Sequence, residues 1–169
     1  MDGAVLARDV RRDAAIVAAC VMLGATFGAL HNALDSQIGP AFYILFKNAP
    51  PAAIIWQRAV FIGVTRGAMM GGLLGAGLCI ASDRPGHSAL PVGKTLRYAL
   101  LPILFAALGS AAGAATGWRV GRWLLHFRAI ADVPINAWVV YGMHHGVYIG
   151  AFVGGVIAWR RLRYTPPPI

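Results

Sequence analysis

The chain contains no glutamate, and all six acidic residues among its 169 are aspartates. Charged residues make up only 12% of the sequence, whereas an ordinary soluble domain carries about 25%. This composition argues against a soluble globular protein and excludes any site built on a glutamate general acid or base. Two cysteines, Cys20 and Cys79, are too few for a disulfide scaffold or a cysteine-rich zinc site.

Long apolar runs dominate the chain instead. A helix needs about 20 apolar residues to cross roughly 30 Å of hydrocarbon, and four segments reach that length: 14–34, 59–82, 98–118 and 133–159. Apolar residues are continuous in them and do not alternate, which excludes half-buried strands. The sequence therefore predicts an all-α integral membrane protein, in which residues 1–169 form one domain folded as a four-helix bundle.

Basic residues are distributed unequally between the two sides that these spans define. With both termini inside, the inner side carries Arg8, Arg11, Arg12, Arg84, Lys94, Arg97, Arg160, Arg161 and Arg163, and the outer side carries Lys47, Arg58, Arg119, Arg122 and Arg128. Cytoplasmic loops hold the excess of lysine and arginine. We therefore expect both termini to be cytoplasmic, in a bacterial inner membrane. The inner basic residues would contact anionic lipid head groups, and no nucleic-acid partner is expected.

Glycine recurs at every fourth residue, in GxxxG patterns that place the glycines on one stripe of each helix. The stripes are Gly24 and Gly28; Gly67, Gly71 and Gly75; Gly109, Gly113, Gly117 and Gly121; and Gly142, Gly146, Gly150 and Gly154. In lipid, helices associate by close approach through small residues. The pattern predicts glycine-zipper packing within the bundle. Alternatively, one stripe docks another subunit or a flat cofactor.

Ionisable groups are costly within the predicted spans, so each is a candidate site residue. With their polar neighbours, the candidates are His31, Asn32 and Asp35 in and just after the first span, Arg66 in the second, and Tyr141, His144, His145 and Tyr148 in the fourth. In the predicted topology they share the outer half of the membrane. We expect Asp35 to pair with Arg66, because each would otherwise be an unpaired charge near lipid.

Three interpretations of this polar cluster are open. As a structural lock, the groups satisfy one another and fix the register of the helices. As a metal or haem site, His31 acts with His144 or His145, and Asp35 supplies an oxygen ligand to a metal. Adjacent histidines point about 100° apart on a helix, so at most one of the two joins His31. As a transport path, a proton or solute passes Asp35 and Arg66.

Two stretches resemble a group of uncharacterised bacterial multi-spanning membrane proteins. In that group the first helix ends in His-Asp-Gln and is followed by Ser-Pro-Glu-Tyr-Phe. Residues 30–43 of this chain read LHNALDSQIGPAFY, and they match the group's pattern at His31, Ile38, Pro40, Phe42 and Tyr43. The fourth span, YGMHHGVYIGAFVGG, is similar to the last span of the same group.

The resemblance has one consequence for the candidate site. It implies that His31, His144 and Tyr148 belong to a shared outer-leaflet site. Asn32 and Ala41 stand where the group has Asp and Glu, so a role that depends on those two carboxylates is not carried over.

Short loops and glycine stripes, with no GxSxG, P-loop or HExxH motif, favour a protein that is not an enzyme. We expect a structural or accessory subunit of a larger inner-membrane complex, with other transmembrane subunits and lipids as partners and no cofactor. One alternative is a haem- or metal-binding redox protein that uses His31 and His144 or His145. Another is a small transporter or channel with its path at Asp35 and Arg66.

Overall fold

The computed structural model describes residues 3–48, 54–83, 90–127 and 132–164. Within these ranges the chain forms helices α1 (Gly3–Ile38), α2 (Pro40–Lys47), α3 (Ile55–Ser82), α4 (Val92–His126) and α5 (Ile135–Tyr164), and no strand. The all-α prediction is confirmed. Each of the four predicted spans lies largely or wholly within one long helix.

Three helices in the described part of the chain are long and apolar enough to cross a membrane: α1 from Val10 to Ile38, α3, and α4. These three support an integral membrane protein. The fourth predicted span lies in α5, which is also long but is not among the three. Two adjacent histidines near its middle and basic residues at its end lower the apolar character of α5.

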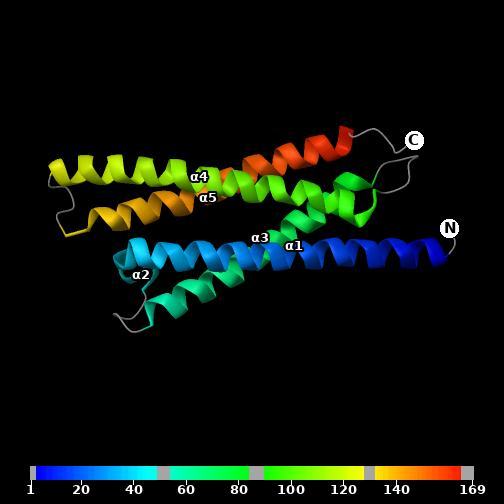
Figure 1. The fold of residues 1–169 in the computed structure, drawn as a ribbon, viewed down its shortest axis with the longest axis horizontal. Coiled ribbons are helices and arrows are strands. Elements are labelled where there is room, and N and C mark those ends of the chain that lie inside the picture. Colours follow the sequence, from blue (N-terminus) through cyan, green and yellow to red (C-terminus); the bar gives the residue numbers. More distant parts are fainter. Residues whose placement is uncertain (1–2, 49–53, 84–89, 128–131, 165–169) are drawn as a thin grey trace.

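The four long helices form two antiparallel pairs, α1 with α3 and α4 with α5 (Figure 1). In the first pair Gly24 lies opposite Gly67, and a Cβ atom on either would overlap the backbone carbonyl of the other. In the second pair Gly109 and Gly146 face each other in the same way. The glycine stripes therefore lie inside the pairs, where only a missing side chain allows backbone-to-backbone contact.

The predicted stripe on α3 is longer than expected by one turn. Gly63 lies opposite Gly28, and a Cβ on Gly63 would lie 2.6 Å from the carbonyl carbon of Gly28. Gly63 lies four residues before Gly67, so the GxxxG spacing already indicates that it belongs to the stripe.

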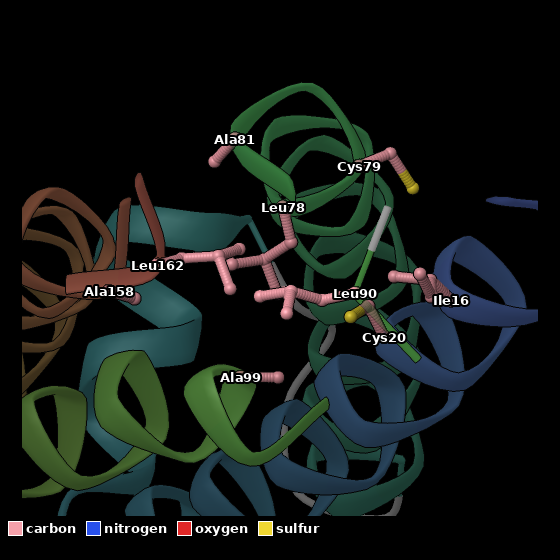
Figure 2. Close-up of a cluster of buried hydrophobic side chains, with 9 residues drawn as sticks. All are labelled: Ile16, Cys20, Leu78, Cys79, Ala81, Leu90, Ala99, Ala158 and Leu162. Atoms are coloured by element: carbon pink, nitrogen blue, oxygen red, sulfur yellow. The ribbon is translucent and has the colours of Figure 1, made fainter. Parts of the chain in front are cut away.

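Two apolar clusters hold the pairs together, one at each end. At the end where α1 begins and α5 finishes, side chains from α1, α3, α4 and α5 meet with Leu90 (Figure 2). The members of this cluster are Ile16, Cys20, Leu78, Cys79, Ala81, Leu90, Ala99, Ala158 and Leu162. At the opposite end, α2 packs against α3 and α5 through buried Phe42 and Tyr43. Both cysteines are free, buried packing residues.

Arg12 connects α1 to the segment between α3 and α4. Its Nε donates a hydrogen bond to the Leu90 carbonyl (2.9 Å), and its Nη2 donates to Ser82 Oγ. Its Nη1 lies 2.6 Å from Asp13 Oδ1 and 3.4 Å from Asp83 Oδ1. Replacing Arg12 with leucine is expected to lower the free energy of unfolding by about 1–3 kcal/mol, because hydrogen bonds to a charged, largely buried group are lost. Denaturant titration in detergent measures the change.

Arg11→Leu is the matched control, because Arg11 is exposed on the same turn. Its effect should stay within about 0.5 kcal/mol. Equal losses from the two variants would show that the Arg12 contacts contribute nothing specific.

Candidate metal centre

Three ligand-type side chains converge where α1 approaches α5. His31 and Asp35 are one helical turn apart on α1 and therefore share a face, and His144 comes from α5. His31 Nε2 lies 3.3 Å and His144 Nδ1 lies 2.9 Å from Asp35 Oδ2. One ligand atom from each residue lies within 4.8 Å of the other two. These residues are called the triad below.

The triad is largely buried. The Asp35 side chain is 0% exposed, and the side chains of His31 and His144 are 11% and 7% exposed. A carboxylate taken out of water is strongly unfavourable unless cations or hydrogen bonds surround it. The position of Asp35 therefore requires a compensating group at the triad.

Hydrogen bonds among the triad do not supply that compensation. Although the nitrogen–oxygen distances are short, neither pair has the geometry of a hydrogen bond. Within the described ranges His31 Nε2, His144 Nδ1 and both carboxylate oxygens of Asp35 lack a hydrogen-bond partner. Each histidine forms an ion pair with Asp35 when it is protonated. With neutral imidazoles, the two nitrogens and the carboxylate form a donor set suited to a transition-metal ion.

Aromatic rings enclose the triad. Phe27 stacks on His31 with ring centroids 5.9 Å apart, and Phe42 lies 4.7 Å from the His144 ring. Tyr43 approaches the same histidine edge-on, at 6.2 Å. These rings pack against both imidazoles and restrict their movement. The sequence predictions did not include Phe27, although its position four residues before His31 places it on the same face of α1.

Tyr43 and Asn32 set the position of α1 around the triad. The Tyr43 hydroxyl donates a hydrogen bond to the Asn32 carbonyl (3.3 Å), and the Asn32 amide donates to the Ala59 carbonyl on α3 (3.0 Å). Burial, assisted by the nearby Asp35 charge, raises the pKa of Tyr43 above its ordinary value, so the hydroxyl keeps its proton. Asn32 is thus a positioning residue for the triad.

The expected pair between Asp35 and Arg66 is wrong. The Asp35 carboxylate lies against the two histidines, whereas Arg66 is exposed and makes no ion pair in the part of the chain that the structure describes. The register of α1 and α3 explains this result, since Gly24 faces Gly67. Arg66 therefore lies level with residue 25, about 15 Å along the helix axis from Asp35.

The remaining predicted residues of the cluster lie outside the triad. His145 is exposed; its ring contacts the Tyr141 ring at 4.3 Å, and its Nδ1 lies 2.8 Å from the Tyr141 carbonyl oxygen. Tyr148 is 40% exposed and lines a cavity between the two helix pairs. Of the two adjacent histidines, only His144 joins His31.

No family model matches the chain, and no curated protein or solved structure matches it either. The resemblance of residues 30–43 to a group of bacterial membrane proteins therefore stays a prediction.

Proposed function

We propose that this protein binds a divalent transition-metal ion in the membrane through His31, Asp35 and His144. One observation carries the proposal: three ligand-type side chains from two helices gather within 4.8 Å, and their facing atoms lack hydrogen-bond partners among the described residues. A bound cation would compensate the buried Asp35 charge and would also accept both nitrogen lone pairs.

The donor set favours Zn²⁺ or Fe²⁺. Two imidazoles and one carboxylate are the protein ligands of many catalytic zinc sites and of non-haem iron sites, where further coordination positions stay open. Calcium and magnesium prefer oxygen ligands, and the triad offers two nitrogens. A haem is less suited to this site, because Asp35 Oδ2 lies within 3.3 Å of both histidine nitrogens, where the porphyrin would have to lie.

The proposal includes four spans, with α5 as the fourth. The support is the pairing of α5 with α4, an apolar helix long enough to cross a membrane, through glycines at Gly109 and Gly146. Two such glycine-zipped pairs would form a four-helix bundle in a bacterial inner membrane. The beginning of α1 and the end of α5 lie at the same end of the molecule (Figure 1), which agrees with two cytoplasmic termini.

The two other expected functions receive less support. The glycine stripes expected to dock a partner subunit face helices of the same chain. A transport path past Asp35 and Arg66 would need both side chains on one continuous cavity. Among the described residues, Arg66 lines the cavity between the helix pairs and Asp35 does not.

The test is metal analysis of protein purified in mild detergent without chelator, after equilibration with Zn²⁺ or Fe²⁺ and removal of the excess. We expect one equivalent of one of these metals in the wild type, and less than about a tenth of it in His31→Ala and in His144→Ala. His145→Ala is the matched control, because it removes the adjacent, exposed histidine and should keep the full equivalent. Equal metal content in all four proteins, or none in the wild type, would contradict the proposal.

A further inference from the structure

A cavity of about 480 Å³ lies between the two helix pairs and begins at the triad. Along α5 it is lined from His144 to Arg160, which corresponds to about 24 Å at the rise of an α-helix. Pockets of about 300–1,000 Å³ with mostly apolar walls and a few polar groups are typical binding sites for small molecules. This central cavity has that size, and its elongated shape suits a chain-like ligand.

The polar groups of the central cavity are concentrated toward its triad end. His31, Asn32, His144 and Tyr148 line that end, and Arg66 follows along α3. The remaining length is lined by leucine, methionine, alanine, glycine and aromatic side chains, as far as Trp159 and Arg160. The ligand that fits this distribution has one polar head and one long apolar tail.

The charge of the lining favours an anionic head. The described residues that line the central cavity include no carboxylate; Arg66 lies toward the triad end, and Arg160 lies at the opposite end. Arg66 lies at membrane depth in α3 and has no ion pair within the described ranges, and charged groups at such depth ordinarily have a partner. The Lys47 ammonium lies 5.4 Å from the centroid of the Phe42 ring, which packs against His144, so a second cation lies near this end.

We propose that the central cavity binds a single-chain anionic amphiphile, of the long-chain carboxylic acid class. Its carboxylate lies between Arg66 and the triad, and its tail extends along α5 toward Trp159. The inference rests on the proposed metal site for one contact of the head, since an open coordination position accepts a carboxylate oxygen. Arg66 and the apolar walls supply the other contacts without a metal.

The first test fills the cavity and leaves the triad unchanged. Gly155 lines the cavity and has no neighbouring atom within 4 Å of a Cβ, so Gly155→Leu places a side chain in the space of the tail. Gly93→Leu is the matched control, because Gly93 is equally unobstructed, exposed and outside the cavity. The probe is radiolabelled oleate, and the measurement is saturable binding to the full-length protein in nonionic detergent.

We expect Gly155→Leu to weaken oleate binding by about tenfold or more and Gly93→Leu to bind like the wild type. Gly155→Ala, a smaller addition, should give an intermediate loss and keeps the test decisive if the leucine variant folds poorly. Oleate binding that is unchanged in the Gly155 variants would overturn the proposal, as would displacement of oleate by equimolar two-chain phosphatidylglycerol.

The second test addresses the head group. Arg66→Gln should weaken oleate binding by about tenfold, the typical effect of losing one charged hydrogen bond. Arg58→Gln, on the same helix but outside the cavity, should not. Equal affinities of the Arg66 and Arg58 variants would overturn the placement of the head.

Metal content, measured on the same samples, separates the two proposals. Gly155→Leu should keep its metal, because residue 155 is about 16 Å along α5 from His144. A wild type that binds oleate in the predicted way but holds no metal would contradict the metal centre alone. A wild type that holds metal but shows no saturable oleate binding would contradict the cavity ligand alone.

Discussion

Replacing Gly146 with alanine is expected to force α4 and α5 apart and to cause the largest stability loss of any single added methyl group in α5. A Cβ at this position would overlap the carbonyl oxygen of Gly109 and lie 2.6 Å from its carbonyl carbon. Backbone atoms of two long helices cannot move aside locally, so the whole pair must separate. We expect a loss of about 3 kcal/mol or more, at the upper end of overpacking effects, measured by reversible unfolding in mixed micelles.

The control for this substitution is Gly155→Ala, on the same helix. Nothing lies within 4 Å of a Cβ on Gly155, and alanine is a better helix former than glycine by about 1 kcal/mol. Gly155→Ala should therefore be neutral or slightly stabilising. Similar losses at both positions would mean that the helices do not meet at Gly146 as described.

Replacing Asp35 with asparagine is expected to abolish metal-dependent stabilisation. The substitution keeps the shape of the side chain but removes the negative charge at the centre of the triad. Loss of even outer-shell groups lowers metal affinity about 10–100-fold, so the loss of a direct ligand should exceed about 100-fold. Zn²⁺ at 100 times its dissociation constant should stabilise the wild type by about 2.7 kcal/mol and the variant by almost nothing, as thermal unfolding with and without Zn²⁺ will show.

Double-mutant cycles test the neighbours assigned to Asp35. Asp35→Asn and His144→Ala should be non-additive, with a coupling of about 0.5–3 kcal/mol, because the two side chains contact each other. The losses in free energy of unfolding caused by Asp35→Asn and Arg66→Leu should add to within about 0.5 kcal/mol, because these two side chains do not contact each other. Strong coupling in the second cycle would restore the Asp35–Arg66 pair and argue against the triad.

The candidate site was partly predictable from local pattern. His31, Asp35 and His144 were identified because polar side chains within apolar runs are costly and few. The i, i+4 spacing also placed His31 and Asp35 on one face of a helix. The same local pattern indicates the wrong partner for Asp35, because opposite charge carries no information about the register of the helices. Arg66 was attractive as an opposite charge, but the glycine contacts between α1 and α3 place it about 15 Å along the axis from Asp35.

The sequence by itself determined the helical fold, the apolar runs and the glycine stripes, because hydropathy and the helical repeat are properties of neighbouring residues. Only the tertiary structure decided that the stripes join α1 to α3 and α4 to α5, and that a cavity remains between these pairs. It also decided that His144, rather than His145 or Arg66, faces Asp35. These results depend on the rotation and axial offset of helices that are distant in sequence. Backbone contact between glycines sets both quantities, and no local pattern encodes them.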